Sequence, residues 1–396
     1  MTQSLDESLH ADLEAMTKAG TLKGFRHITS PMDTEVTMAE KQGRILVLSS
    51  NNYLGLADHP EVVAAAKQAL DEYGAGTASV RFICGTFAIH KEIEHSLARL
   101  SRTHAALTYV SCWAANTGLL PAVAGEQDAI VSDALNHASL IDGCRGSKAK
   151  RLVYAHSDMD DLRQKLAEVR EARRIFIVTD GVFSMEGDVA KLPDIVHLAR
   201  RYNASVILDD SHGVGVMGKR GRGTCEYHGV EGNIAIVTGT LGKALGGAAG
   251  GYVAGSQALI DYLSQVSRPQ IFSNALPTSI AASAKKAIEI LEREPQRVER
   301  LHALTRKMRE GLKHRGFKPL DGDSAIIPII VGETAFAIRM SQELLKEGIF
   351  ITGFGYPVVP EGAARLRIQM CASLTDQQID FALERFEKVG KKLGVV

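Results

Sequence analysis

Short apolar runs alternate with amphipathic stretches from about residue 60 to residue 285. The apolar runs predict strands over about 105–110, 129–132, 152–154, 175–179, 206–209, 234–238 and 250–254. Between them, apolar positions recur every three or four residues and predict helices, most clearly over 61–73, 91–100 and 192–202. Uninterrupted apolar runs are typical of strands that are buried on both faces. The pattern therefore predicts an α/β fold with a mostly parallel sheet covered by helices.

The two ends of the chain show other patterns. A helix is expected over about 5–19, followed by a polar hairpin that leads to an apolar run at 45–48. Beyond residue 290 a charged helix (about 295–314) precedes strands near 325–331, 349–352 and 365–370, with a helix over 334–346 among them. A last helix starts after Thr375, with Gln378 three residues on as in a capping box. Because a single core rarely grows beyond about 300 residues, we expect an N-terminal arm (1–54), a large α/β domain (55–290) and a small α+β domain (291–396).

Composition narrows the function classes. The 396 residues carry equal numbers of acidic and basic side chains, so the net charge gives no reason to expect a nucleic-acid partner. No apolar run reaches the roughly 18 residues of a membrane span, and the acidic start lacks a signal-peptide core. A cytoplasmic protein is expected. Five scattered cysteines without a CxxC pair indicate reduced thiols, and no metal-binding spacing is present.

Lys243, Asp209 and His212 are the strongest candidates for chemistry. Asp209 and His212 follow the apolar run at 206–208, and Lys243 follows the run at 234–237 in a glycine-rich turn. The carboxyl ends of parallel strands are where open α/β sheets bind ligands. A lysine can form a Schiff base with pyridoxal phosphate, and an ionised carboxylate can keep its ring nitrogen protonated. The three residues together predict a site for this cofactor, with Asp210 as the alternative carboxylate.

Other polar residues follow neighbouring strands. Cys112 and Trp113 start a helix after the strand at 106–110, and the amides at a helix start bind phosphate well. His137 follows the next strand, where its ring can stack on a pyridine, and Ser184 follows the strand at 175–179. Each has a plainer explanation as a core or structural residue. Their shared position at strand ends favours the functional explanation.

Three further motifs leave alternatives open. The segment at 239–244 lacks the spacing and the Ser or Thr of a phosphate loop. The glycines at 213–218 match GxGxxG, but they stand in a loop and do not open a helix. Arg365 and Arg367 lie on one face of a predicted strand, where one would be a solvated surface charge and the other a partner for a substrate carboxylate.

Five segments taken together resemble the α-oxoamine synthases, which are fold-type I pyridoxal-phosphate enzymes. They are 51–56 (NNYLGL), 136–139 (NHAS), 179–187 (TDGVFSMEG), 209–212 (DDSH) and 238–243 (TGTLGK). The resemblance extends over essentially the whole chain. It implies a large domain with a mostly parallel sheet, a smaller C-terminal α+β domain, and a homodimer with shared active sites.

The resemblance also implies roles for individual residues. Lys243 would carry the cofactor and move the substrate proton, Asp209 would pair with the ring nitrogen, His212 would bind the phenolic oxygen, and His137 would stack on the ring. The phosphate would be held by Cys112, Trp113 and Thr240, with Ser273 and Asn274 of a neighbouring subunit. The amino-acid substrate would be bound by His137, Arg367, Asn52 and Ser184, the last also close to the cofactor.

The implied reaction joins an amino acid to an acyl-CoA. The segments 78–86, 267–274 and 356–360 resemble members that condense glycine with acetyl-CoA or a short acyl-CoA, which gives 2-amino-3-oxobutyrate and CoA in threonine and glycine metabolism. Members that lose CO2 while making 8-amino-7-oxononanoate, or while joining palmitate to serine, are the alternative. Trp113, Gln270 and Gly355 depart from the first pattern, the last two near the expected acyl-CoA entrance.

Overall fold

The computed structural model describes residues 4–22 and 24–396, which form two compact units. Residues 1–3 of the acidic N-terminal stretch lie outside the described part. One unit comprises Asn51–Ser184 and Asp188–Arg300. The other takes in the N-terminal residues up to Ser50, the short segment Met185–Gly187 and Leu301–Val396.

The larger unit contains a seven-stranded sheet in the order β3-β9-β8-β7-β6-β4-β5. Its strands are β3 (Ala105–Tyr109), β4 (Ala129–Asp133), β5 (Lys150–Tyr154), β6 (Ile175–Asp180), β7 (Ala204–Asp209), β8 (Ile236–Thr240) and β9 (Gly251–Gly255). Only β9 runs against its neighbours, while β5, β4, β6, β7 and β8 pair in parallel. The predicted mostly parallel α/β sheet is confirmed.

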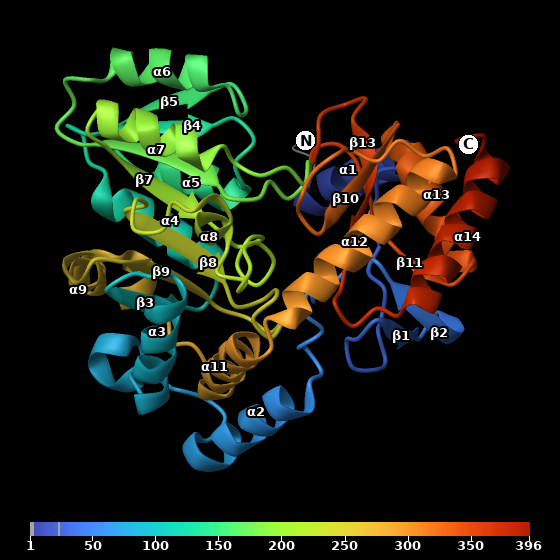
Figure 1. Ribbon diagram of the computed structural model, residues 1–396, viewed down its shortest axis with the longest axis horizontal. Coiled ribbons are helices and arrows are strands. Elements are labelled where there is room, and N and C mark those ends of the chain that lie inside the picture. Colours follow the sequence, from blue (N-terminus) through green and yellow to red (C-terminus); the bar gives the residue numbers. More distant parts are fainter. Residues whose placement is uncertain (1–3, 23) are drawn as a thin grey trace. The chain divides into compact units, whose positions relative to one another are not determined.

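Helices cover both faces of this sheet (Figure 1). The helices of this unit are α2 (Pro60–Tyr73), α3 (Ala88–Leu100), α4 (Cys112–Val123), α5 (Ala138–Gly146), α6 (Met159–Glu168), α7 (Leu192–Arg201), α8 (Thr224–His228), α9 (Gln257–Val266), α10 (Arg268–Phe272) and α11 (Thr278–Arg293), with a π-helical turn at Arg81–Gly85. Among them, α2 packs against α11.

Alternate residues of the central strands supply two separate cores. Val131 and Ile177 pack with apolar residues of α6 and α7. Ile130 and Val178, one position away on the same strands, pack with residues of α4, α5 and α9. Because successive side chains on a strand point to opposite faces, one uninterrupted apolar run serves both layers. This packing fixes the strand ends, and therefore the residues that follow them.

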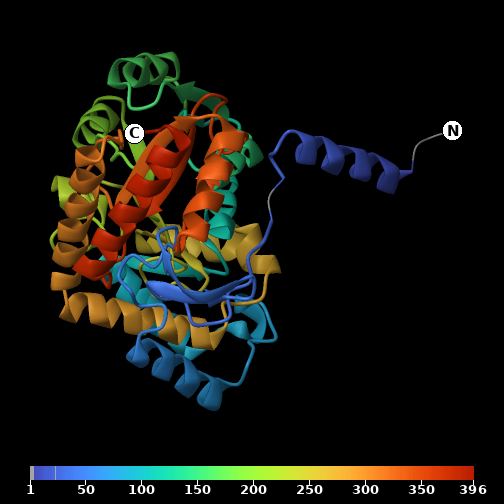
Figure 2. The ribbon, with the colours of Figure 1, turned by 90° about the vertical axis from the view of Figure 1, so that its right-hand side faces the viewer.

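The smaller unit is built on two three-stranded sheets, in the orders β1-β2-β11 and β10-β13-β12. Its elements are α1 (Leu5–Lys18), β1 (Glu35–Met38), β2 (Lys41–Val47), β10 (Ile326–Gly332), α13 (Thr334–Lys346), β11 (Ile349–Phe350), β12 (Gly353–Phe354), β13 (Ala364–Gln369), α14 (Asp376–Leu393) and the part of α12 (Gln296–His314) that follows residue 300. Figure 2 shows α13 and α14 lying side by side. The Thr375–Gln378 capping box at the start of α14 is confirmed.

The division of the chain differs from the three segments expected from the sequence. The N-terminal residues do not form an arm of their own up to residue 54, because β2 pairs in parallel with β11 and so joins the C-terminal unit. The boundary between the units falls at residue 300, inside α12, and not near residue 290. A strand pairing between residues 300 positions apart leaves no trace in local sequence.

Candidate active site

Twelve residues of the larger unit surround a cavity of about 260 Å³. They come from the carboxyl ends of β4, β6, β7 and β8 and from the start of α4, as the rule for open α/β sheets requires. The lining residues are Ser111, Cys112, Trp113, His137, Ser139, Asp180, Ser184, Asp209, Ser211, His212, Thr240 and Lys243.

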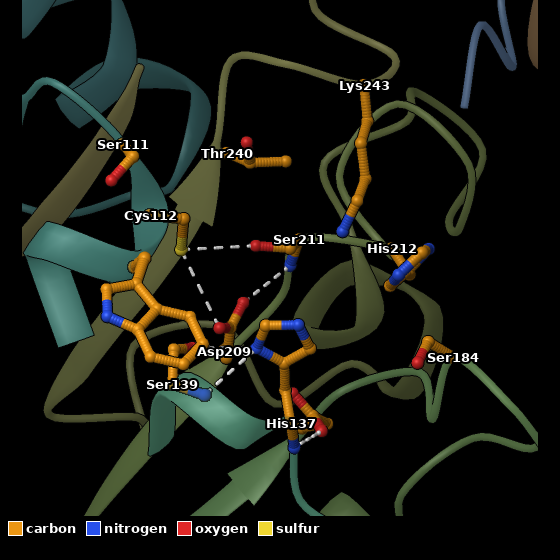
Figure 3. A pocket seen from close by; sticks show the side chains of 12 residues that line it. Ser111, Cys112, His137, Ser139, Ser184, Asp209, Ser211, His212, Thr240 and Lys243 are labelled. Carbon is orange, nitrogen blue, oxygen red and sulfur yellow. Dashed lines mark hydrogen bonds between the residues drawn. The ribbon is translucent and has the colours of Figure 1, made fainter. Parts of the chain in front are cut away.

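Lys243 and Asp209 face this cavity from neighbouring strands. β7 and β8 pair in parallel with Asp209 opposite Thr238, and the turn after β8 brings Lys243 back over the sheet edge. Figure 3 shows the amine of Lys243 directed into the pocket and the carboxylate of Asp209 at its centre. An amine and a carboxylate thus share one enclosed space.

The carboxylate of Asp209 is buried and held from three sides. The side-chain amide of Asn116 donates to it at 2.6 Å and the backbone N–H of Ser211 donates at 3.0 Å. The thiol of Cys112 lies 3.6 Å from the same carboxylate. Since a carboxylate only accepts hydrogen bonds, these donors fix the orientation of the Asp209 side chain in the pocket.

Asp210, the alternative carboxylate, forms hydrogen bonds with Thr224 at the end of the loop that follows it. It accepts from the backbone N–H of Thr224 at 2.8 Å and from the hydroxyl of Thr224 at 2.9 Å. Burial raises the pKa of Asp210 to about 7, although the bonds from Thr224 oppose the shift. Asp210 does not line the cavity, whereas Asp209 does.

His137 is locked in place beside Asp209. Its backbone N–H donates to the carboxylate of Asp180 at 2.6 Å, and its Nδ1 atom shares a hydrogen bond with the hydroxyl of Ser139 at 2.8 Å. Burial lowers the pKa of His137, so the ring is neutral near pH 7. A neutral, fixed imidazole can pack against an aromatic ring without bringing a second cation to the site.

His212 has a partner behind the pocket wall. The hydroxyl of the fully buried Tyr53 shares a hydrogen bond with Nδ1 of His212 at 2.8 Å. This contact fixes the orientation of the imidazole. Tyr53 stands in the NNYLGL segment, where the sequence had suggested Asn52 as the functional residue.

The start of α4 forms a candidate phosphate cradle. Ser111 caps the helix by accepting the N–H of Ala114, and the first-turn amides of Cys112 and Trp113 follow it. Gly251 of β9 packs so closely that a Cβ there would lie 2.3 Å from the backbone nitrogen of Cys112. The hydroxyl of Thr240 also lines the cavity, so backbone amides and a hydroxyl converge at this end.

The two side chains at the start of α4 have different surroundings. Burial raises the pKa of the Cys112 thiol well above its usual value, so it stays protonated. Trp113 is 46% exposed and meets the ring of His137 edge-on, with 6.2 Å between ring centres. The phosphate-binding role of Cys112 and Trp113 stays a prediction.

Four of the residues singled out from the sequence lie outside this lining. Asn52 accepts the N–H groups of Leu56 and Ala57 at 2.9 and 3.1 Å, as in a turn. Ser273 ends the short helix α10, and Asn274 bridges to Val80. Arg367 belongs to the smaller unit. The roles given to these four residues stay predictions.

The arginine pair on β13 shows a different arrangement from the one expected. Neither arginine is a solvated surface charge, because β13 is the middle strand of its sheet and both side chains are buried. Arg365 is ion-paired with Glu186 at 3.1 Å. The contacts of Arg367 include the side-chain oxygen of Gln369 at 3.0 Å and the ring of Phe354, 4.6 Å from its guanidinium carbon.

Several residues around the pocket were not predicted from the sequence: Ser111, Ser139, Asp180, Ser211, and Asn116 behind Asp209. Asn116 stands one helical turn after Cys112 on α4, which places both on the same face. That spacing could have indicated Asn116. Nothing in the sequence joins it to Asp209, which is 93 positions away.

The pocket fits pyridoxal phosphate, the cofactor implied by the sequence resemblance. An amine for its aldehyde, a held carboxylate for its ring nitrogen, a fixed imidazole for its ring and a helix start for its phosphate all face one cavity. Among the described residues, no group of His, Cys, Asp and Glu is arranged to hold a metal ion. No described helix is long and apolar enough to cross a membrane.

Comparison with known proteins points the same way. Residues 44–386 match the family model "Aminotransferase class I and II". The chain is 48% identical to 2-amino-3-ketobutyrate coenzyme A ligase of Escherichia coli, with 98% of each chain covered. It is 45% identical to 8-amino-7-oxononanoate synthase of Thermosipho melanesiensis, with 99% of this chain and 100% of the relative covered.

The structure is also similar to solved structures of relatives, one of which contains the cofactor. Serine palmitoyltransferase from S. paucimobilis, determined with bound PLP and myriocin, matches with a TM-score of 0.94 and 31% identity over the whole of both chains. The family match extends over most of the chain, and these relatives are similar over its full length. The chain therefore belongs to the class I and II aminotransferase family, within its α-oxoamine synthase branch.

Proposed function

We propose that the protein is a pyridoxal-phosphate enzyme that condenses glycine with acetyl-CoA, or another short acyl-CoA, to give 2-amino-3-oxobutyrate and CoA. The main support for this proposal is that Lys243, Asp209 and His137 line the same cavity. The full-length identity of 48% to the E. coli ligase supports the choice of substrates. The reaction would belong to threonine and glycine metabolism.

The residues of the pocket would divide the binding of the cofactor between them. Lys243 would bond to the aldehyde carbon, and the amides at the start of α4, with Thr240, would hold the phosphate. The carboxylate of Asp209, oriented by the hydrogen bonds from Asn116 and Ser211, would pair with the protonated ring nitrogen. His137 would pack on the ring, and His212 would meet its phenolic oxygen.

The bound cofactor supplies an electron sink for negative charge at the α-carbon of glycine. Lys243 would act as the general base that removes the α-proton, since its amine points into the cavity. The guanidinium of Arg367 would bind the glycine carboxylate, with Ser184 and Asn52 assisting. Arg365 is less suited to this task, because it is already paired with Glu186.

The smallest active unit would be a homodimer. Ser273 and Asn274 do not line the cavity of their own chain, yet the resemblance gives them a phosphate-binding role. A neighbouring copy would supply them, and two-fold symmetric dimers are the commonest way to complete such a site. A cytoplasmic location is proposed on composition alone, and a relative at 45% identity, the human enzyme, is named mitochondrial.

A decarboxylating reaction is the second candidate, because the 8-amino-7-oxononanoate synthase of T. melanesiensis is nearly as similar. The two candidate reactions can be distinguished by an assay of CoA release. Free CoA thiol is measured for glycine, alanine and serine, each combined with acetyl-, pimeloyl- or palmitoyl-CoA, and CO2 is measured in the same reactions. Glycine with acetyl-CoA should give the highest kcat/KM and no CO2. Stoichiometric CO2, or faster thiol release with alanine or serine, would establish the alternative.

A further inference from the structure

A partly buried charge cluster lies beside the pocket but does not line it. His156, just after β5, shares a hydrogen bond between Nδ1 and the carboxylate of Asp133 at 2.9 Å. Its Nε2 shares another with the carboxylate of Asp188, also at 2.9 Å. The side chain of Asp133 is 1% exposed and that of His156 is 22% exposed. One imidazole therefore joins two carboxylates from separate segments of the chain.

Each carboxylate belongs to a loop that enters the pocket. Asp133 ends β4 four residues before His137, and it also accepts the N–H groups of Leu135 at 2.9 Å and Ser157 at 3.0 Å. The carbonyl of Asp188 accepts the N–H of Phe183 at 3.0 Å, which closes the loop that carries Ser184. The cluster thus fixes the base of both loops.

The ring of His156 also packs against the second loop. It meets the ring of Phe183 edge-on, with 4.4 Å between ring centres and 81° between the planes. Phe183 is buried and directly precedes Ser184. A shift of the imidazole would therefore move the backbone next to a residue that lines the pocket.

The two carboxylates require a doubly protonated ring, because each needs an N–H donor. Partial burial by itself lowers the pKa of His156, but the hydrogen bonds that its ring donates to Asp133 and Asp188 outweigh this effect and raise the pKa to about 10. His156 is thus a permanent cation near pH 7. Without it, two buried or half-buried carboxylates would be left without their shared donor.

We propose that His156 is a positioning residue of the condensation: it holds the His137 loop and the Ser184 loop at a fixed spacing around the cofactor and glycine. The proposal rests on the proposed function for its substrates. His156 acts through His137 and Ser184, because it is not among the residues that line the cavity.

A second charge cluster, built on one buried carboxylate, provides a matched control. Asp128 precedes β4 at the opposite end of the same strand, is buried, and binds Arg173 at 2.8 Å and Arg174 at 2.9 Å. Its variant removes comparable interactions without touching a pocket loop. Variants of both clusters are expected to lose stability. Only variants of the His156 cluster are expected to change the surroundings of the cofactor.

The experiment compares His156→Phe, Asp188→Ala and Asp128→Asn holoproteins. An achiral cofactor shows visible circular dichroism only through its asymmetric surroundings, so this signal reports the packing of His137 without turnover. His156→Phe and Asp188→Ala should keep their bound cofactor but change the amplitude of this signal by about twofold or more. Their kcat/KM for glycine should fall about tenfold to a hundredfold, the usual cost of misplaced reacting groups. Asp128→Asn should keep both values and lose only thermal stability.

The proposal is overturned if the two variants keep the wild-type spectrum and kinetics, or if Asp128→Asn changes them equally. Should His156→Phe not fold, Asp188→Ala decides alone, since the side chain of Asp188 is 35% exposed and tolerates truncation better. If the wild type binds the cofactor but releases no CoA from acetyl-CoA with glycine, the proposed function fails. The spectral comparison would still decide the role of His156.

Discussion

Replacing Asn116 by alanine tests whether Asp209 must be held in place to act. The amide of Asn116 is fully buried, and it donates to Asp209 at 2.6 Å and to the hydroxyl of Ser139 at 2.9 Å. The variant keeps the charge of Asp209 but removes its strongest donor. We therefore expect turnover to fall while the phosphate cradle at the start of α4 retains the cofactor.

The magnitude follows from the type of contact that is lost. A hydrogen bond to a charged group contributes about 1.5–3 kcal/mol. If that contribution is felt fully in the transition state, kcat falls by about one to two orders of magnitude, at roughly 1.4 kcal/mol for each factor of ten. The assay is CoA thiol release from acetyl-CoA with glycine, with cofactor content measured from absorbance in the same sample.

Thr224→Val is the matched control for this prediction. It removes one buried hydrogen bond, 2.9 Å long, to the neighbouring carboxylate of Asp210 while keeping the shape of the side chain. It should reduce thermal stability and leave kcat within about twofold, since effects confined to stability do not enter the barrier of the folded enzyme. A kcat of Asn116→Ala within threefold of the wild type, or an equal loss in Thr224→Val, would refute the reasoning.

Three further predictions address the substrate site, the subunit contacts and pH. Arg367→Ala should raise the KM for glycine about tenfold or more with normal cofactor absorbance, and an unchanged KM would reassign the carboxylate site. Mixing Lys243→Ala with Ser273→Ala subunits should restore part of the activity that each lacks, and an active monomer in sedimentation would exclude shared sites. Because folding raises the pKa of Asp210 to about 7 from an unfolded value near 3.9, the native state binds the extra proton and loses stability as pH rises between these values. Asp210→Asn should flatten that fall in Tm, and an unchanged profile would contradict the shift.

The sequence predicted the parts of the site that stand at strand ends. Lys243, Asp209 and His137 each follow an apolar run, and a parallel sheet necessarily brings such positions to one edge. The capping box at Thr375 was equally visible, since it is a local signal. The local sequence pattern and the geometry of a parallel sheet were therefore sufficient to predict these features.

The remaining features depend on contacts between distant residues. Nothing in the sequence places Asn116 against Asp209 or Tyr53 against His212, because these pairs are 93 and 159 positions apart. The alternation around Arg365 suggested a half-exposed strand, whereas β13 has neighbours on both sides and is buried throughout. The strand expected near 349–352 is shortened to Ile349–Phe350 (β11), and the next short strand, Gly353–Phe354 (β12), belongs to a different sheet.

The central claim is that Lys243 carries pyridoxal phosphate in the cavity with Asp209. It is tested most directly by reducing the yellow holoprotein with borohydride, digesting it and locating the modified lysine by mass spectrometry. The account predicts one pyridoxyl group per chain, on Lys243, and a Lys243→Ala protein that has neither the modification nor turnover. Modification of another lysine, or normal turnover by Lys243→Ala, would contradict it.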